Sequence, residues 1–473
     1  MHGGRRNDLR TADRICAHLR YLRSTPRSTR RASPAASTAD VADSRRCDVL
    51  GTSIAGLAGL EYASLSARVL FTTGVVFATL IGVAVGRYPA LRMNRATIAF
   101  VGAVVLVLGG SIRREDAWRL IDWDTIALLF AMMVINANFR LSGFFHFVGS
   151  RIARHAATPK RLLALIIFAG GLLSAIFLND TIVLMFTPLV LDLTLSMRRD
   201  PVPYLIGLVS AANIGSVATI TGNPQNMIVG TASGIPFAEF TSLLAPVAIA
   251  GLALAWAIIV ALHRREFSGM RLSTDFVMPE RSYRPLLRKS VLATGAMLVA
   301  FLAGAPVTLS ALGAAAVLLV TRRLKPARVF REIDWSLLVF FASLFAVTGS
   351  LQINGLSAQL FTFCRPWIEG SLPAFCAVAV VLSNVVSNVP AVMLFRPVIP
   401  DLPDPRAAWL ALAAATTLAG NLTLLGSVAN LIVAEIARVR GVRLSFMAYL
   451  RAGAPITLVT LVVAVGWIAL MTD

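Results

Sequence analysis

Charged residues are scarce in this chain of 473 residues: Asp, Glu, Lys and Arg make up 14% of it, whereas hydrophobic residues make up 57%. A soluble domain typically carries about 25% charged residues. The mean hydropathy is +0.74, and the apolar runs are about 20 residues long, the length that a helix needs to cross a bilayer. The composition excludes an ordinary soluble protein and predicts an all-α polytopic membrane protein.

Histidine and cysteine are also rare, at five and four residues. The cysteines have neither metal-ligand spacing nor the pattern of a disulfide framework, and the histidines fall in the N-terminal tail or near the ends of apolar segments. These absences argue against a zinc site or a histidine proton relay in the membrane. The chain also lacks a His-Glu-x-x-His motif and a Gly-Lys-Ser/Thr phosphate loop. We therefore expect no cofactor and no enzymatic activity, a membrane-embedded enzyme being the alternative from another class.

Acidic residues are fewer than basic ones, 24 against 44, and the formal net charge is +20. In a soluble domain this excess would indicate nucleic-acid binding. Here the arginines lie mainly in short loops between apolar segments, as the positive-inside rule expects of cytoplasmic loops. We therefore expect no nucleic-acid partner, and we expect a multi-pass protein embedded in the lipid bilayer of the bacterial inner (plasma) membrane.

The positions of the long apolar runs divide the chain into a tail, transmembrane helices and two related halves. The predicted regions are a disordered basic tail (1–50), N-terminal transmembrane helices (51–112), inverted repeat 1 (113–262), a cytoplasmic linker (263–288), a transmembrane helical pair (289–333) and inverted repeat 2 (334–473). The tail has no apolar run with which to bury a core. The segment 50–67 is only weakly apolar, so we expect about 10 to 11 crossings, depending on whether that segment crosses.

Two apolar stretches are too long for one helix and too short for two full crossings. The stretch 161–197 is flanked by basic residues on both sides, which predicts a re-entrant hairpin that enters from the cytoplasm with Asn179 and Asp180 at its tip. The stretch 371–400 is flanked by Glu369 and Asp401, which predicts a hairpin that enters from outside. Hairpins of opposite entry are what an inverted repeat requires.

Polar and helix-breaking residues recur at matching places in the two halves. Backbone groups freed at a break are tolerated in hydrocarbon only where they line a cavity or bind something. Side-chain oxygens suit an alkali cation, and the N-termini of restarting helices suit an anion. The candidate substrate- or ion-binding residues are Asn179, Asp180, Thr181, Thr219, Gly222, Asn223 and Asn226 in the first half, and Ser387, Asn388, Thr423, Gly426, Ser427 and Asn430 in the second.

These polar residues also have a purely structural interpretation, in which they only allow close helix packing and interhelical hydrogen bonds. The presence of four clusters in matched pairs favours binding. A carboxylate near the bilayer centre costs about 2.5–3.5 kcal/mol on insertion scales, so Asp180 is interpreted as a site for a coupling cation or proton, with helix capping as its alternative. Arg396 either attracts an anion or extends toward the interface; the second interpretation is favoured.

Four motifs resemble the signatures of the ion transporter superfamily, in its citrate-transporter-like and arsenite-pump-like branch: Asn179-Asp180-Thr181, Thr221-Gly222-Asn223-Pro224-Gln225-Asn226, Ser387-Asn388-Val389-Pro390 and Gly426-Ser427-Val428-Ala429-Asn430. The resemblance spans roughly residues 69–471. It implies an inverted-repeat fold with two hairpins, often dimeric, that carries anions by sodium or proton coupling in an elevator-type motion. Sodium-dicarboxylate members have Ser-Asn-Thr at both tips. The tips here read Leu178-Asn179-Asp180 and Ser387-Asn388-Val389, which favours the arsenite-pump or anion-permease side.

The function predicted from these features is secondary active transport of a small anion or oxyanion, coupled to protons or sodium. A homodimer is expected. The candidate bound metal is a sodium ion, held at Asn179 and Asn388. The alternatives are an arsenite/antimonite efflux permease and a sodium/proton antiporter. An ATPase subunit is expected as a partner only for the arsenite-type permease, because the chain has no phosphate loop of its own.

Overall fold

The computed structural model describes residues 68–88, 93–268, 282–320 and 325–472. The predicted tail at 1–50 and the weak segment at 50–67 lie outside the described residues. Eight of the described helices are long and apolar enough to cross a membrane, and α3, α14 and α18, whose bounds follow below, are shorter apolar helices. The chain is a helical polytopic membrane protein, which confirms the predicted fold class.

The first half begins with a helix that carries no label and continues from β1 to α11. In chain order they are Arg68–Val85, β1 (Arg87–Tyr88), β2 (Met93–Asn94), α3 (Arg95–Leu108), α4 (Arg114–Arg119), α5 (Trp123–Leu141), α6 (Phe144–His155), α7 (Pro159–Ile176), α8 (Asn179–Ser196), α9 (Pro201–Ser216), α10 (Pro224–Ser233) and α11 (Phe237–Leu262). The two short strands pair antiparallel. A single turn, α12 (Arg264–Phe267), follows.

The second half repeats this order of helices. In chain order they are α13 (Arg284–Leu302), α14 (Val307–Leu319), α15 (Pro326–Arg331), α16 (Trp335–Ile353), α17 (Leu356–Ile368), α18 (Leu372–Val386), α19 (Asn388–Phe395), the 3-10 turn η1 (Ile399–Asp401), α20 (Pro405–Ala419), α21 (Val428–Val439) and α22 (Phe446–Thr472). The helix Arg68–Val85 corresponds to α13. The two equivalent series of helices therefore begin before residues 113 and 334, the starts predicted for the inverted repeats.

Equivalent helices begin with the same local chemistry. Asp122 Oδ1 accepts a hydrogen bond from the backbone of Thr125 at the start of α5, and Asp334 Oδ1 accepts one from Leu337 at the start of α16, both at 3.0 Å. The helices α9 and α20 each follow a capping Asp and begin with Pro, a residue that suits the first helical turn because it needs no hydrogen-bond acceptor there. The repeat is therefore visible in helix capping as well as in helix order.

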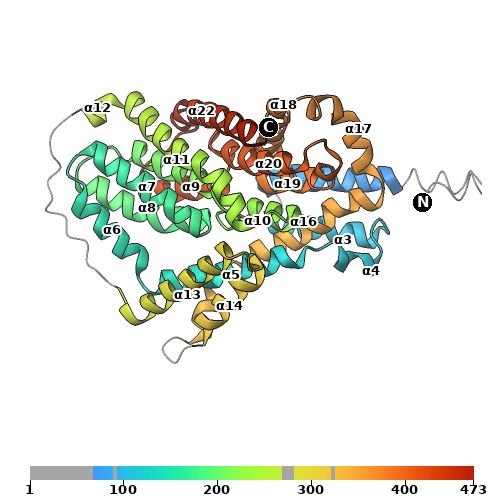
Figure 1. The fold of residues 1–473 in the computed structure, drawn as a ribbon, viewed down its shortest axis with the longest axis horizontal. Helices are drawn as coiled ribbons and strands as arrows, with labels where there is room; N and C mark the ends of the chain where they lie inside the picture. Colours follow the sequence, from blue (N-terminus) through green and yellow to red (C-terminus); the bar gives the residue numbers. More distant parts are fainter. Residues whose placement is uncertain (1–67, 89–92, 269–281, 321–324, 473) are drawn as a thin grey trace, which may run out of the picture. The chain divides into compact units, whose positions relative to one another are not determined.

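The helices pack into two bundles (Figure 1). In the first bundle α3 packs against α16, and α5 and α13 pack against α14. In the second bundle α7 and α8 pack against α9, α18 packs against α20, and α11 packs against α22. We use "first bundle" for α3, α5 and α13–α16, and "second bundle" for α7–α11 and α18–α22. Each bundle contains equivalent helices from both repeats.

Both predicted hairpins are present in the second bundle, and each breaks at the predicted place. The first consists of α7 and α8, with α8 beginning at Asn179, and the second consists of α18 and α19, with α19 beginning at Asn388. In the same bundle α9 and α10 form one broken helix, and α20 and α21 form the other. All of the matched polar motifs therefore belong to the second bundle.

Opposite entry of the two hairpins is testable by thiol labelling. In a variant whose native cysteines are replaced by serine, Lys160→Cys and Arg198→Cys should react with a membrane-impermeant maleimide only from the cytoplasm, and Gly370→Cys and Asp401→Cys only from outside. All four positions are exposed in the structure. Labelling of the two ends of one hairpin from different faces would refute the inverted-repeat topology.

Candidate functional site

A cavity of about 330 Å³ lies where the two hairpin tips approach the restarts of the two broken helices. Its lining comes largely from the starts of α3, α8, α10, α16, α19 and α21. The polar lining residues at these starts are Asn94, Arg95, Asn179, Asp180, Gln225, Asp334, Ser336, Ser387, Asn388 and Ser427. Each helix N-terminus acts as about half a positive charge, so the convergence of helix starts favours negative charge in the cavity.

The first helix break is stabilised by a buried asparagine. Between the end of α9 at Ser216 and the start of α10 at Pro224, backbone carbonyls lose their helical donors. Asn226 Nδ2 donates to the carbonyl oxygens of Ser216 and Thr219, both at 3.0 Å. One side-chain amide thus satisfies two acceptors that hydrocarbon would otherwise leave unpaired.

The second helix break is stabilised in the same way. Asn430 Nδ2 donates to the carbonyl oxygens of Gly420 at 2.7 Å and Thr423 at 2.9 Å. These acceptors precede Asn430 by the same sequence separations that the acceptors of Asn226 have. The paired asparagines therefore hold equivalent breaks open with equivalent hydrogen bonds.

A residue of the first repeat also enters the break of the second. Asn213 of α9 donates through Nδ2 to Asn421 Oδ1 at 2.9 Å and to Asn430 Oδ1 at 3.1 Å. Its own Oδ1 accepts from Ser427 Oγ at 3.2 Å. All four side chains are buried, so the end of α9 is joined to the interior of the second break.

The reciprocal contact comes from Thr417, which occupies the position in α20 that Asn213 occupies in α9. Thr417 Oγ1 accepts from Asn223 Nδ2 at 3.2 Å and from Gln225 Nε2 at 3.3 Å. The same hydroxyl lies 3.3 Å from Asn226 Oδ1, to which it donates. Each repeat thus hydrogen-bonds the break of the other, and the two breaks form one connected unit.

The hairpin tips are tied to this unit by their asparagines. The backbone N–H of Asn179 donates to Gly222 O at 3.0 Å, and its Nδ2 lies 3.4 Å from Asn213 Oδ1. Asn388 Oδ1 accepts from Ser383 Oγ of the preceding arm at 2.7 Å. The first tip is therefore held by the first break, whereas the second tip is held by its own hairpin.

Two backbone positions at the site tolerate few alternatives. Ser387, at the second tip, has φ +80, a conformation that costs a residue with a side chain about 1–3 kcal/mol. At Gly222 a Cβ atom would lie 2.6 Å from the carbonyl oxygen of Ser216. Glycine is needed there because the chain approaches itself too closely for any side chain.

Three charged side chains line the cavity together. Asp180 comes from the first hairpin tip, Asp334 from the start of α16, and Arg95 from the start of α3. Asp180 interacts electrostatically with both of the others. Among the described residues no group of three or more His, Cys, Asp or Glu side chains is arranged to hold a metal ion.

The structure separates the predicted site residues into two groups. Those that line the cavity are Asn179, Asp180, Ser387, Asn388 and Ser427. Those that lie behind it, in the hydrogen bonds and packing of the tips and breaks, are Thr181, Thr219, Gly222, Asn223, Asn226, Thr423, Gly426 and Asn430. Direct binding of a substrate or ion by this second group stays a prediction. The side-chain polar atoms of these residues already form hydrogen bonds within the protein, and the two glycines have no side chain.

Several residues of the site were not identified from the sequence. Asp334 has a signal in the sequence, because Ile333-Asp334-Trp335 matches Ile121-Asp122-Trp123 of the other repeat, but a matched helix start does not by itself indicate binding. Gln225 lies inside the motif from Thr221 to Asn226, but it was not among the predicted site residues. Arg95 gave no signal, because an arginine that opens an apolar run looks like an ordinary loop residue.

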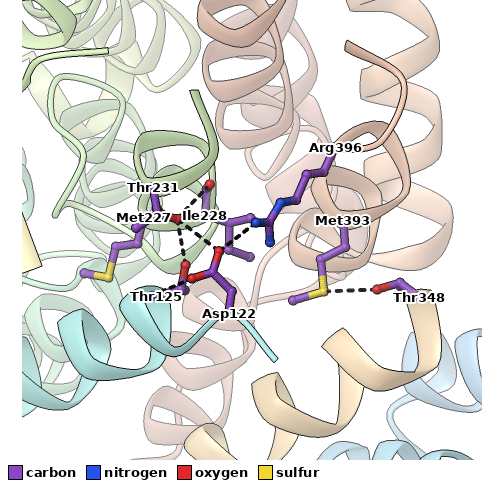
Figure 2. A network of polar contacts seen from close by, with 8 residues as sticks. All are labelled: Asp122, Thr125, Met227, Ile228, Thr231, Thr348, Met393 and Arg396. Carbon is purple, nitrogen blue, oxygen red and sulfur yellow. Dashed lines mark hydrogen bonds and ion pairs between the residues drawn. The ribbon is translucent and has the colours of Figure 1, made fainter. Parts of the chain in front are cut away.

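The structure gives Arg396 a protein partner that neither interpretation included. Its Nη2 lies 2.9 Å from Asp122 Oδ2 (Figure 2), so extension toward the interface stays a prediction. Thr231 donates to the same carboxylate at 3.5 Å and lies 2.8 Å from the hydroxyl of Thr125. The guanidinium also lies over the ring of Phe345, 5.7 Å from its centroid. An acidic partner from the other repeat holds this arginine.

Comparison with known proteins agrees with the predicted resemblance. A family described as Citrate transporter (CitMHS) matches residues 69–416. The chain is 30% identical over 399 residues to a 46 kDa membrane protein of Mycobacterium leprae, with 79% of this chain and 93% of the relative covered. It is 29% identical over 451 residues to the silicon efflux transporter LSI3 of Oryza sativa, with 80% and 92% covered.

More distant similarities exist to other transporters. The putative transporter arsB of Dictyostelium discoideum is 22% identical over 499 residues, with 80% of this chain and 88% of that protein covered. Among solved structures, the YdaH transporter of Alcanivorax borkumensis aligns with 85% of this chain and 97% of its own, at 14% identity and a TM-score of 0.48.

The geometry separates residues that line the cavity from residues that support the helix breaks. Asn179→Ala and Asn388→Ala should abolish uptake with little loss of stability, because each removes a cavity-lining amide. Asn213→Ala should instead lower the thermal stability, by about 1–3 kcal/mol, because it leaves buried acceptors of the second break without a donor. Uptake normalised to folded protein, together with thermal unfolding of the purified variants, checks both expectations. Near-normal uptake in both tip variants would contradict the assignment of the cavity.

Proposed function

Because the chain belongs to the citrate transporter (CitMHS) family, we propose that this membrane transporter is a secondary active carrier of a small anion or oxyanion across the bacterial inner membrane, coupled to protons or sodium. The observation that carries the proposal is the cavity at which both hairpin tips and both helix restarts meet. Discontinuous helices whose N-termini point at an anionic substrate are the usual construction of such carriers.

The electrostatics of the cavity support an anion of low charge. Six helix starts, those of α3, α8, α10, α16, α19 and α21, and the guanidinium of Arg95 favour negative charge, but two of the starts already carry the carboxylates of Asp180 and Asp334. A tricarboxylate would place several further negative charges beside these carboxylates, and like charges at close range repel strongly where water is scarce. A small monoanion therefore fits better than a polyanion.

The volume of the cavity supports a small substrate. Sites for drug-sized ligands have about 300–1,000 Å³, and this cavity, at about 330 Å³, is at the lower end of that range. Its lining mixes donors and acceptors, as Asn179, Gln225 and Ser387 illustrate. Such groups suit the hydroxyl and oxo groups of an oxyanion.

Asp180 supports coupling to a cation. Its carboxylate receives no hydrogen bond from another described side chain, although it lies in the cavity at a hairpin tip. The Oδ1 atoms of Asn179 and Asn388 each already accept a hydrogen bond, which makes Asp180 the freer acceptor. A proton or a sodium ion bound at Asp180 would also reduce the repulsion between this carboxylate and an anionic substrate.

An uncharged oxyacid is the second candidate substrate class, represented by an arsenite/antimonite efflux permease. The observation that favours it is the excess of carboxylates over guanidinium groups among the lining residues, two against one. The names of two relatives, a silicon efflux transporter and a putative transporter arsB, agree with it. Sodium/proton antiport remains a third alternative, in which Asp180 would carry both ions in turn.

A flux panel in proteoliposomes tests these candidates. Among radiolabelled phosphate, sulfate, succinate, citrate and arsenite, we expect flux of phosphate, part of which is a monoanion at neutral pH, driven by an imposed proton or sodium gradient; arsenite represents the uncharged oxyacid. Asp180→Asn should remove the dependence on that gradient, whereas Asp192→Asn, at a half-exposed carboxylate of the same helix that lies outside the cavity and pairs with Arg440, should keep it. Flux of arsenite alone would support the second candidate, and sodium flux without any anion would support the antiporter.

A further inference from the structure

Arg95 is a cation at the cavity that has no hydrogen-bond or ion-pair partner among the described residues. It is the first residue of α3 and is only partly exposed. Its guanidinium makes no hydrogen bond or ion pair with another described residue, and its electrostatic neighbour is Asp180. Charged side chains inside a membrane protein are expensive and generally pair with a group of opposite charge or serve a function.

The backbone beside Arg95 is shaped to place its side chain. Gly86 has φ +82, and a Cβ atom at that position would lie 3.3 Å from Arg95 Nε. The short β1–β2 ladder joins Gly86 to Arg95. The guanidinium thus rests against a glycine that leaves room for it, and it remains at the cavity wall.

We propose that Arg95 binds the negative charge of the transported anion and thereby determines that the site prefers anions over neutral solutes. This inference rests on the proposed function and adds a residue from the first bundle to a site whose other recognition groups come mainly from the second. A guanidinium offers several donors in a plane and binds oxyanions through two hydrogen bonds at once. Asp180, the neighbouring carboxylate, acts as the counter-charge of Arg95 until the substrate arrives.

The test measures anion binding separately from transport. The purified full chain is titrated with phosphate, sulfate, citrate and arsenate at constant ionic strength, and thermal unfolding gives the concentration dependence of stabilisation. For the stabilising anion, Arg95→Gln should raise the half-saturating concentration at least about tenfold, and Arg95→Lys should lie between it and the wild type. Arg151→Gln, at an exposed arginine over the ring of Phe147, is the matched control and should leave binding unchanged.

The outcomes separate this inference from the proposed function. Equal concentration dependence in wild type and Arg95→Gln would overturn the inference, as would flux of arsenite with no stabilisation of the wild type by any anion. Binding that depends on Arg95 without flux of that anion would sustain Arg95 as an anion-binding residue but contradict the proposed function, and with it the claim that the bound anion is the transported one. If Arg95→Gln does not fold, a tenfold loss in Arg95→Lys supports the role of the planar guanidinium, and unchanged binding overturns it.

A different observation concerns Asp122 and Asp334, which are equivalent residues in unequal surroundings. Asp122 caps α5, and Asp334 caps the equivalent helix α16. Asp334 is exposed at the cavity, whereas the side chain of Asp122 is only 10% exposed and is paired with Arg396. The position that corresponds to Arg396 in the first repeat is Thr187, which donates to the carbonyl of Val183 in its own helix. Among the residues that the structure describes, Asp334 therefore has no equivalent ion pair.

The Asp122–Arg396 pair also joins the two bundles. Asp122 begins α5 of the first bundle, whereas Arg396 follows α19 of the second (Figure 2). By contrast, Arg140–Glu332 lies within the first bundle and Arg406–Glu239 within the second. Any movement of one bundle past the other must break or stretch the contact between Asp122 and Arg396.

We infer that Asp122 and Arg396, with Thr231, form a latch between the two bundles that opens once in each transport cycle. Separation of the two charges leaves each of them without its partner in a partly buried place, which is costly, and the threonine hydroxyls provide alternative hydrogen bonds when the charges separate. The latch is an asymmetric feature in a fold built from two equivalent halves.

Cross-linking tests the latch. A short bifunctional thiol reagent applied to Asp122→Cys/Arg396→Cys should stop flux, and cleavage of the linker should restore it. The control is Glu239→Cys/Arg406→Cys, a pair of similar contact within the second bundle, whose cross-linking should leave flux intact. Undiminished flux after complete cross-linking of 122 to 396 would refute the latch. If that variant does not insert, the charge exchange Asp122→Arg/Arg396→Asp decides: recovery of the flux that Arg396→Asp alone loses supports the latch, and no recovery refutes it.

Discussion

The constraint on which this structure depends is that backbone carbonyls freed by a helix break must find donors inside a membrane. An unpaired polar group costs several kcal/mol there. Asn226 and Asn430 meet this requirement with the same pair of hydrogen bonds in each repeat. Because the first break is held open in this way, the carbonyl of Gly222 is available to the tip residue Asn179. The geometry of the tip therefore follows from the repair of the break.

The second consequence is that the two repeats cannot be treated as independent. Asn213 bonds the interior of the second break and Thr417 bonds the interior of the first. Removal of either side chain would leave buried groups unpaired in the other repeat. The breaks and hairpins are thus one body, which is suited to move as a unit against the first bundle. The cavity opens where that body meets α3 and α16 of the first bundle.

Much of the fold could be predicted because its signals are local in sequence. Hairpin length and flanking charge located both tips, and the paired motifs located both breaks. The individual roles of residues were harder to predict, because a polar residue in a membrane helix looks the same whether it binds a ligand or repairs the backbone. Asn226 and Asn388 illustrate this: both are asparagines in matched motifs, yet only Asn388 lines the cavity. The roles of Arg95 and Arg396 depend on their tertiary surroundings, the cavity for Arg95 and Asp122 for Arg396, which no local pattern encodes.

The two halves, whose sequences are similar in motif and order, differ in the surroundings of Asp122 and Asp334. Asp122 and Asp334 have the same neighbours in sequence and the same capping role, so local chemistry cannot explain why one is paired and the other is exposed. The difference arises from Arg396, for which the first repeat has only Thr187. A carrier built from inverted repeats must close each end in turn, and equal latches would give two equally stable closed states. A charged latch at Asp122 that has no counterpart at Asp334 therefore favours the state of the empty protein in which the latch is closed, and the arrival of substrate and coupling ion must supply the differential binding energy that reverses this bias.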